Sequence, residues 1–434
     1  MLARILFPRN KNYGNLLWRK EELQGNEADL SLSLQGLRKL GYWASAYPEG
    51  DGVTFATKNK QDQEQIMNDF VQSFSWLTIE KGNLTDSNLV LAELEDMANE
   101  KTDVECIVIV PLERVHFEAT FEIGPFKFVC AEVFQSLGDE RLADFAGAYI
   151  QFNTKLEYAD LLRGGASIKG DDLIINKCLS IAEHVMDVIR LEYSSFSKPE
   201  FTPNPVGQLE TGFYAVEIIP TGGSHLKNLN LGGISRPMSA SNNWLGPEID
   251  DVAFHSKNYL IEILEGRDDE LALTVKSALR GCRQSFYCLG DESRFLNLVF
   301  TLDGLTHAGG WTGWKQRTYI AAVVSGGQID YFARVLKRYE ELYDVRNALV
   351  HKGKDFYEMG LSPAQSCEDL YDHVRTVIEL ISGNNFTSVA ELHDYAKSLL
   401  RQSNWQARYQ AELTAIGQAK GQTPQQIVSK MPAW

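Results

Sequence analysis

The residues best suited to chemistry lie close together near the C-terminal end of the chain. Arg346, Asn347 and His351 all fall within the segment 343–353. Arginine donates two parallel hydrogen bonds to a phosphate group, and histidine titrates near neutral pH and transfers protons. Together these residue types fit the metal-free cleavage of a phosphodiester.

One predicted helix carries all three residues. Apolar and aromatic side chains recur at helical spacing upstream of Arg346, and a lysine and a glycine end the pattern, which predicts a helix over 328–352. Each residue advances the helix by roughly 100°, so Asn347 and His351 share a face while Arg346 lies about 140° from His351. Either the long arginine bends across, or two copies of the helix meet.

A purely structural interpretation of the same residues is also open. Arg346 then pairs with an acidic side chain such as Asp344 or Asp369. His351 then sits at the end of its helix only because the helix dipole favours a positive charge there.

A local excess of basic residues surrounds the motif. Arg338, Lys352 and Lys354 are the candidates for binding RNA phosphates. Glu340, Glu341 and Asp344 interrupt the basic run, so a solvated helix face is the alternative interpretation.

Further helices are predicted on both sides of the motif. Their apolar residues recur every three to four positions over 271–289, 292–305, 311–324, 362–381, 388–401 and 405–418. The pattern predicts an all-helical unit over 265–385, followed by a helical tail over 386–434. The tail begins with Ser388 and Glu391 in the spacing of a capping box.

The helical unit resembles the HEPN superfamily, and within it the Apea-like group of prokaryotic defence proteins. The resemblance covers residues 268–384 and rests on Arg-Asn-x-x-x-His late in a long helix, entered through the segment 293–305. It implies a dimeric ribonuclease whose two Arg/His motifs face each other, with no metal or cofactor. Arg346, Asn347 and His351 then form the catalytic motif, and Asp303 is the candidate for the supporting acid on an earlier helix. The implied products carry a cyclic phosphate and a 5′-hydroxyl.

Charge is distributed unevenly over the 434 residues. The net charge is −16, which argues against a surface that coats nucleic acid. Residues 1–264 contribute −15, residues 265–385 contribute −3 and residues 386–434 contribute +2. The acidity therefore lies in the N-terminal part, away from the motif.

The N-terminal part alternates between strand and turn signals. Strands are predicted over 104–110, 115–123, 126–133 and 212–219, helices over 61–74 and 171–193, and an irregular segment over 221–247. The expected fold class is therefore α+β. Residues 1–264 form a mixed sensor or regulatory region, with a further break expected near 140–170, and 265–385 form the helical bundle.

Two functions from different classes remain open. The first is a metal-independent endoribonuclease that acts in antiphage defence and is held off by its N-terminal region until a phage protein or nucleic acid triggers it. The second is a non-catalytic module for dimerisation or for binding a nucleotide or protein. No apolar run is long enough for a membrane span, no signal-peptide core begins the chain, and six scattered cysteines predict a reducing cytoplasm.

Overall fold

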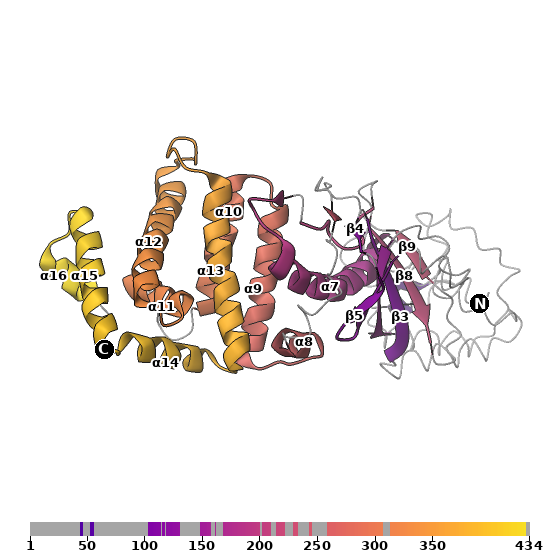
Figure 1. The fold of residues 1–434 in the computed structure, drawn as a ribbon. Helices are drawn as coiled ribbons and strands as arrows, with labels where there is room; N and C mark the ends of the chain where they lie inside the picture. Colours follow the sequence, from indigo (N-terminus) through magenta and orange to yellow (C-terminus); the bar gives the residue numbers. More distant parts are fainter. Residues whose placement is uncertain are drawn as a thin grey trace, which may run out of the picture. The chain divides into compact units, whose positions relative to one another are not determined.

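A computed structural model describes most of the C-terminal half of the chain and part of the N-terminal half. The described residues are 44–46, 53–55, 103–113, 115–117, 119–130, 148–157, 161, 168–199, 202–209, 214–221, 229–232, 243–244, 258–306 and 313–430. The chain divides into two compact units, of which one comprises 1–113, 126–182 and 206–238, and the other 114–125, 183–205 and 239–434. The first holds most of an antiparallel sheet and the second is mostly helical, so the predicted α+β class is confirmed (Figure 1).

The sheet is built around strand β3 (Asp103–Leu112), whose β-branched residues favour extended backbone. Its order is β5-β6-β7-β3-β8-β9. Strand β7 (Ala148–Glu157) pairs with β3 along its whole length, from Asp103 opposite Glu157 to Leu112 opposite Ala148. Val108 and Val110 are fully buried in this central strand. Strand β7 was not predicted, and it crosses the residues where a break was expected.

The remaining strands are short. They are β1 (Ala44–Ala46), β2 (Val53–Phe55), β4 (Val115–His116), β5 (Phe121–Ile123), β6 (Phe126–Val129), β8 (Ala215–Pro220), β9 (Leu229–Gly232) and β10 (Asn243–Trp244). The strand predicted over 115–123 is thus two strands, and the segment predicted to be irregular over 221–247 contains β9 and β10. The helix predicted over 61–74 lies outside the described residues.

The predicted helices from residue 271 onward are all present, with ends shifted by a few residues. The helices are α7 (Ile168–Tyr193), α8 (Asn258–Leu264), α9 (Glu270–Tyr287), α10 (Asp291–Thr306), α11 (Gly313–Ser325), α12 (Ile329–Lys352), α13 (Pro363–Asn384), α14 (Val389–Leu400), α15 (Ser403–Ala419) and α16 (Pro424–Lys430). The capping box of Ser388 and Glu391 begins α14 as predicted. None of the described helices is both long and apolar enough to cross a membrane.

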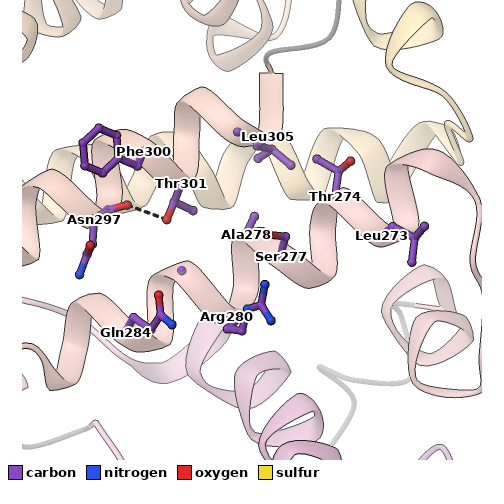
Figure 2. Close-up of a pocket in the computed structure, with 12 residues that line it drawn as sticks. Leu273, Thr274, Ser277, Ala278, Arg280, Gln284, Asn297, Phe300, Thr301 and Leu305 are labelled. Atoms are coloured by element: carbon purple, nitrogen blue, oxygen red, sulfur yellow. Dashed lines mark hydrogen bonds between the residues drawn. The ribbon is translucent and has the colours of Figure 1, made fainter.

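Helices α9 and α10 approach closely at Gly281. A Cβ atom on this residue would lie 2.1 Å from Thr301 Oγ1, so only glycine fits at this crossing. A groove of about 520 Å³ opens beside the crossing (Figure 2), lined by Thr274 and Ser277 on α9 and by Asn297 and Phe300 on α10, among others. None of the predicted site residues lines this groove.

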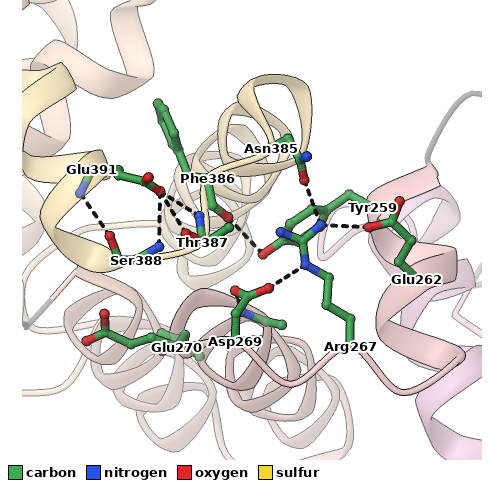
Figure 3. A network of polar contacts seen from close by, with 12 residues as sticks. Tyr259, Glu262, Arg267, Asp269, Glu270, Asn385, Phe386, Thr387, Ser388 and Glu391 are labelled. Atoms are coloured by element: carbon green, nitrogen blue, oxygen red, sulfur yellow. Dashed lines mark hydrogen bonds and ion pairs between the residues drawn. The ribbon is translucent and has the colours of Figure 1, made fainter.

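A polar junction around Arg267 ties four helices of the second unit together (Figure 3). The Arg267 guanidinium lies 4.2 Å from the ring centroid of Tyr259 on α8 and hydrogen-bonds Asp269, which caps α9. It also donates to Asn385 Oδ1, at 2.6 Å, at the end of α13. Glu270 of α9 accepts a hydrogen bond from Val389 N, the first residue of α14. These contacts fix where the helices begin and end.

Candidate active site

Helix α12 carries the Arg/His motif at its C-terminal end. One face of the helix is buried against the bundle, which leaves the opposite side exposed. The helix ends at Gly353, whose positive φ of 60° is the left-handed conformation typical of a C-terminal cap. Its N–H donates to Ala348 O. His351 is exposed in the last turn, and Arg346 and Asn347 are half-buried just before it.

The structure brings Arg346, Asn347 and His351 together within one chain. Arg346 Nη1 lies 3.1 Å from Asn347 Oδ1 and 3.2 Å from His351 Nε2. Of the two alternatives, the long arginine therefore bends across the helix. A second copy is not needed to bring the guanidinium and the imidazole into contact.

The contact also defines the state of the imidazole. A guanidinium has donors only, so His351 Nε2 must accept the hydrogen bond from Arg346. An Nε2 that accepts a hydrogen bond belongs to the tautomer with its proton on Nδ1. A neutral imidazole with an accepting Nε2 is the form that a general base requires.

The acids proposed as structural partners of Arg346 have other partners. Asp344 Oδ2 lies 3.0 Å from Lys420 Nζ, and Asp369 Oδ2 lies 2.6 Å from Arg338 Nη2. Among the described residues, no carboxylate forms an ion pair with Arg346. Its positive charge is therefore available to an incoming anion.

The described side-chain hydrogen bond of Asp303 goes to helix α11. Asp303 lies on α10, and its Oδ1 accepts a hydrogen bond from Gln316 Nε2 of α11 at 2.7 Å. Burial raises the pKa of Tyr339 well above its ordinary value, and the charge of Asp303 adds to this rise, so Asp303 lies near the buried ring of Tyr339. Neither Arg346 nor His351 is among its described hydrogen-bond partners.

The three basic residues proposed to bind RNA differ in their surroundings. Arg338 is held by Asp369 and by Glu341, whose Oε2 lies 3.1 Å from Arg338 Nη1, so its charge is already balanced. Lys352 and Lys354 are exposed, and neither forms an ion pair with a described carboxylate. The two lysines thus have charges without a described partner, whereas the charge of Arg338 is paired.

Tyr343 is a neighbour of the site that the sequence analysis did not single out. Its ring centroid lies 5.8 Å from the Arg346 guanidinium and 4.2 Å from the guanidinium of Arg317 on α11. Arg317 is buried and paired with Glu340, which also accepts a hydrogen bond from Lys420 of α15 at 2.8 Å. The sequence could have indicated this neighbour, because Tyr343 lies one helical turn before Arg346. The network joins α11, α12 and α15 beneath the motif.

Known proteins give no guide to this chain. No family model, no curated protein and no solved structure matches it. Within the described part of the chain, no group of three or more His, Cys, Asp or Glu side chains is arranged to hold a metal ion. All six cysteines are free thiols and five of them are buried. The function of the chain must therefore be inferred from its own residues.

Proposed function

We propose that the chain is a metal-independent endoribonuclease of the HEPN type. The observation that carries the proposal is the 3.2 Å contact between Arg346 Nη1 and His351 Nε2 on an exposed helix end. It places a cation and a proton acceptor within reach of one phosphodiester. RNA supplies the nucleophile for such a site, its own 2′-hydroxyl.

The first step follows from the hydrogen bonds of the free site. A bound phosphate takes over the donors of Arg346, which releases His351 Nε2 to accept the proton of the 2′-hydroxyl. The 2′-oxygen then attacks phosphorus, and Arg346 stabilises the charge that develops on the phosphate oxygens. Asn347 helps to hold the guanidinium in place, since its Oδ1 accepts from Nη1. Departure of the 5′-oxygen leaves a 2′,3′-cyclic phosphate and a 5′-hydroxyl.

A second copy of the chain would complete the reaction. The attacking and leaving oxygens of a phosphoryl transfer lie roughly in line, on opposite sides of phosphorus. One imidazole that takes the proton from the 2′-hydroxyl is on the wrong side to protonate the 5′-oxygen. A homodimer with two-fold symmetry offers the partner's His351 as the acid, in the protonated imidazolium form that can donate a proton to the 5′-oxygen. The dimer is thus part of the proposal for a chemical reason, not to bring Arg346 and His351 together.

The biological role is proposed from the same resemblance. The N-terminal region carries nearly all of the net negative charge of the chain, and an acidic cover near an RNA site repels the substrate. We propose that this region holds the nuclease off in the cytoplasm until a phage-derived trigger arrives, and that the released activity leads to abortive infection. Lys352 and Lys354 bind the phosphates that flank the cleaved bond.

Incubation of the purified full chain with total RNA, with and without phage lysate as the source of the trigger, tests this function. The expected products have a 5′-hydroxyl, which polynucleotide kinase labels directly, and a cyclic phosphate at the other end. Products with a 5′-phosphate would contradict the mechanism, because attack by the 2′-hydroxyl cannot form them. If the protein binds RNA through Arg346 and His351 but leaves it intact, with and without phage lysate, the alternative of a non-catalytic binding module is correct.

A further inference from the structure

The loop after the motif presents one aromatic ring to solvent. Tyr357 is 92% exposed, more than any other large hydrophobic residue among those described. Its neighbour Phe356 is 3% exposed and packs edge-on against Phe295 of α10, with ring centroids 5.5 Å apart. Phe356 therefore anchors the loop in the core, whereas Tyr357 has no packing role.

Hydrogen bonds fix the loop that carries Tyr357. Asp355 Oδ1 accepts from Glu358 N at 2.7 Å, and Glu358 Oε2 accepts from Asp355 N at 3.2 Å. Gly360 N donates to Tyr357 O at 3.0 Å, and Leu361 N donates to Phe356 O at 3.1 Å. The backbone at Tyr357 is thus held by local bonds and by the buried anchor. A binding residue held in this way loses little conformational freedom when a ligand arrives.

Tyr357 also lies within reach of the Arg346–His351 site. Tyr357 lies six positions after His351, which limits the distance between their Cα atoms to about 20 Å. The chain turns back at once after the helix, because both Gly353 N and Lys354 N donate to Ala348 O. Figure 1 shows this loop as the connection between α12 and α13. A bound RNA strand advances by about 3.4 Å or more per nucleotide. The distance between His351 and Tyr357 therefore corresponds to a few nucleotides.

The charges around Tyr357 favour a polyanion over a protein partner. Lys352 and Lys354 precede it and are exposed without ion pairs among the described residues. The acidic residues of the loop, Asp355 and Glu358, direct carboxylate oxygens to backbone N–H groups. A phosphate backbone that follows the lysines would bring its bases to the ring.

We propose that Tyr357 is a stacking platform for a base of single-stranded RNA bound at the Arg346–His351 site, an inference that rests on the proposed function. Stacking of a base on an aromatic ring needs an exposed base face, which a duplex does not offer, and it is tolerant of sequence. The substrate class is therefore unpaired RNA, such as a loop or a linear strand, without a strict sequence requirement.

Binding measurements in the full chain with His351→Ala, which keeps the RNA intact, test the inference. The probe is a fluorescein-labelled single-stranded RNA oligonucleotide, compared with the same oligonucleotide annealed to its complement. Adding Tyr357→Ala is expected to weaken single-strand binding by about 5- to 150-fold and to remove the preference over the duplex. Tyr357→Phe keeps the ring and is expected to bind like the parent. Tyr331→Ala is the matched control, since Tyr331 is 40% exposed in the first turn of α12, far along the helix from the motif.

Unchanged RNA affinity in Tyr357→Ala would overturn the inference, as would a wild-type preference for the duplex. If Tyr357→Ala instead changed the mass in light scattering and left RNA affinity intact, the ring would be a protein interface and the inference would be wrong. RNA that is held through Tyr357 but never cleaved by the wild-type chain would refute the proposed function alone. The two failures are therefore distinguishable.

Discussion

Arg346 and His351 are five residues apart on one helix, yet Arg346 Nη1 lies 3.2 Å from His351 Nε2. Their Cα–Cβ directions differ by about 140° around the axis, so only the length and flexibility of arginine allow the contact. A lysine would present a single ammonium group where arginine presents a fork of donors. The relationship explains why the motif needs arginine, whose Nη1 reaches both Asn347 Oδ1 and His351 Nε2.

Asn347 is expected to matter through Arg346 and not through the substrate. Asn347→Ala removes the acceptor that lies 3.1 Å from Arg346 Nη1. A hydrogen bond to a charged group contributes about 1.5–3 kcal/mol, and partial exposure lowers that figure, so a loss of about tenfold in kcat/KM on RNA is expected. Asn347→Asp keeps an acceptor and is the matched variant. Equal cleavage by Asn347→Ala and the wild type would show that Arg346 is held without it.

Asp303 is expected to contribute to stability and not to catalysis. Its Oδ1 accepts from Gln316 Nε2, a bond that links α10 to the neighbouring helix α11. Asp303→Ala should therefore lower the free energy of unfolding by about 1 kcal/mol and leave the cleavage rate of the folded protein within about threefold of the wild type. A urea titration and an initial-rate assay on the same preparation separate the two effects. If Asp303→Ala instead had the stability of the wild type and a much lower cleavage rate, Asp303 would have a role in catalysis.

The close crossing of α9 and α10 gives a paired test of the packing. Gly281→Ala places a Cβ 2.1 Å from Thr301 Oγ1, so overpacking is expected to lower the free energy of unfolding by about 1–3 kcal/mol. Gly304→Ala in α10 meets no atom within 4 Å and is expected to stabilise by about 0.5–1 kcal/mol, because alanine is the better helix former. Thermal melts of Gly281→Ala and Gly304→Ala, each compared with the wild type, test this prediction. Destabilisation by both substitutions to the same extent would mean that the crossing is looser than described.

The buried histidine of α13 predicts how stability depends on pH. Burial lowers the pKa of His373 to about 4, with a contribution from the nearby Arg338, while Asp369 opposes the shift. Since the unfolded chain takes up this proton near pH 6.5, it binds more protons than the folded chain between pH 6.5 and 4. Stability therefore falls as the pH falls through that window, by about 2 kcal/mol between pH 7 and 5.

His373→Gln is the variant that isolates this effect. It does not titrate, so its unfolding midpoint in urea should fall less than that of the wild type between pH 7 and 5. Other histidines, such as His184 and His393, have pKa values that are also lowered by burial, but they contribute equally to both proteins. Parallel pH profiles for wild type and variant would mean that the pKa of His373 is the same in the folded and unfolded states.

The helical part was predictable because periodicity and end signals agree there. Apolar spacing located α9 to α15, and the cap residues Gly353, Ser362 and Ser388 set their ends. Strand β7 was missed although Tyr149, Ile150, Phe152 and Leu156 are buried and alternate in part with polar residues. Strand β7 pairs with β3 and β6, and neither pairing can be read from the local sequence.

The site was predictable in its residues and less so in its geometry. Rotation about the helix axis gives the directions of the Cβ atoms but not the reach of a long side chain, so the contact between Arg346 and His351 stayed one of two alternatives. The partner of Asp303 depends on how α10 and α11 pack, which spacing along one helix does not report. The ion pair of Arg338 was not predictable for the same reason, because Asp369 reaches it from α13.

The rate of RNA cleavage by His351→Ala tests the central claim most directly. The measurement compares the wild-type chain with His351→Ala on one labelled single-stranded RNA, in the presence of a metal chelator, after circular dichroism has shown that both are folded. The account predicts cleavage by the wild type with the chelator present and a rate about 10²–10⁴-fold lower in the variant. Undiminished cleavage by folded His351→Ala would contradict the assignment of the reaction to this motif.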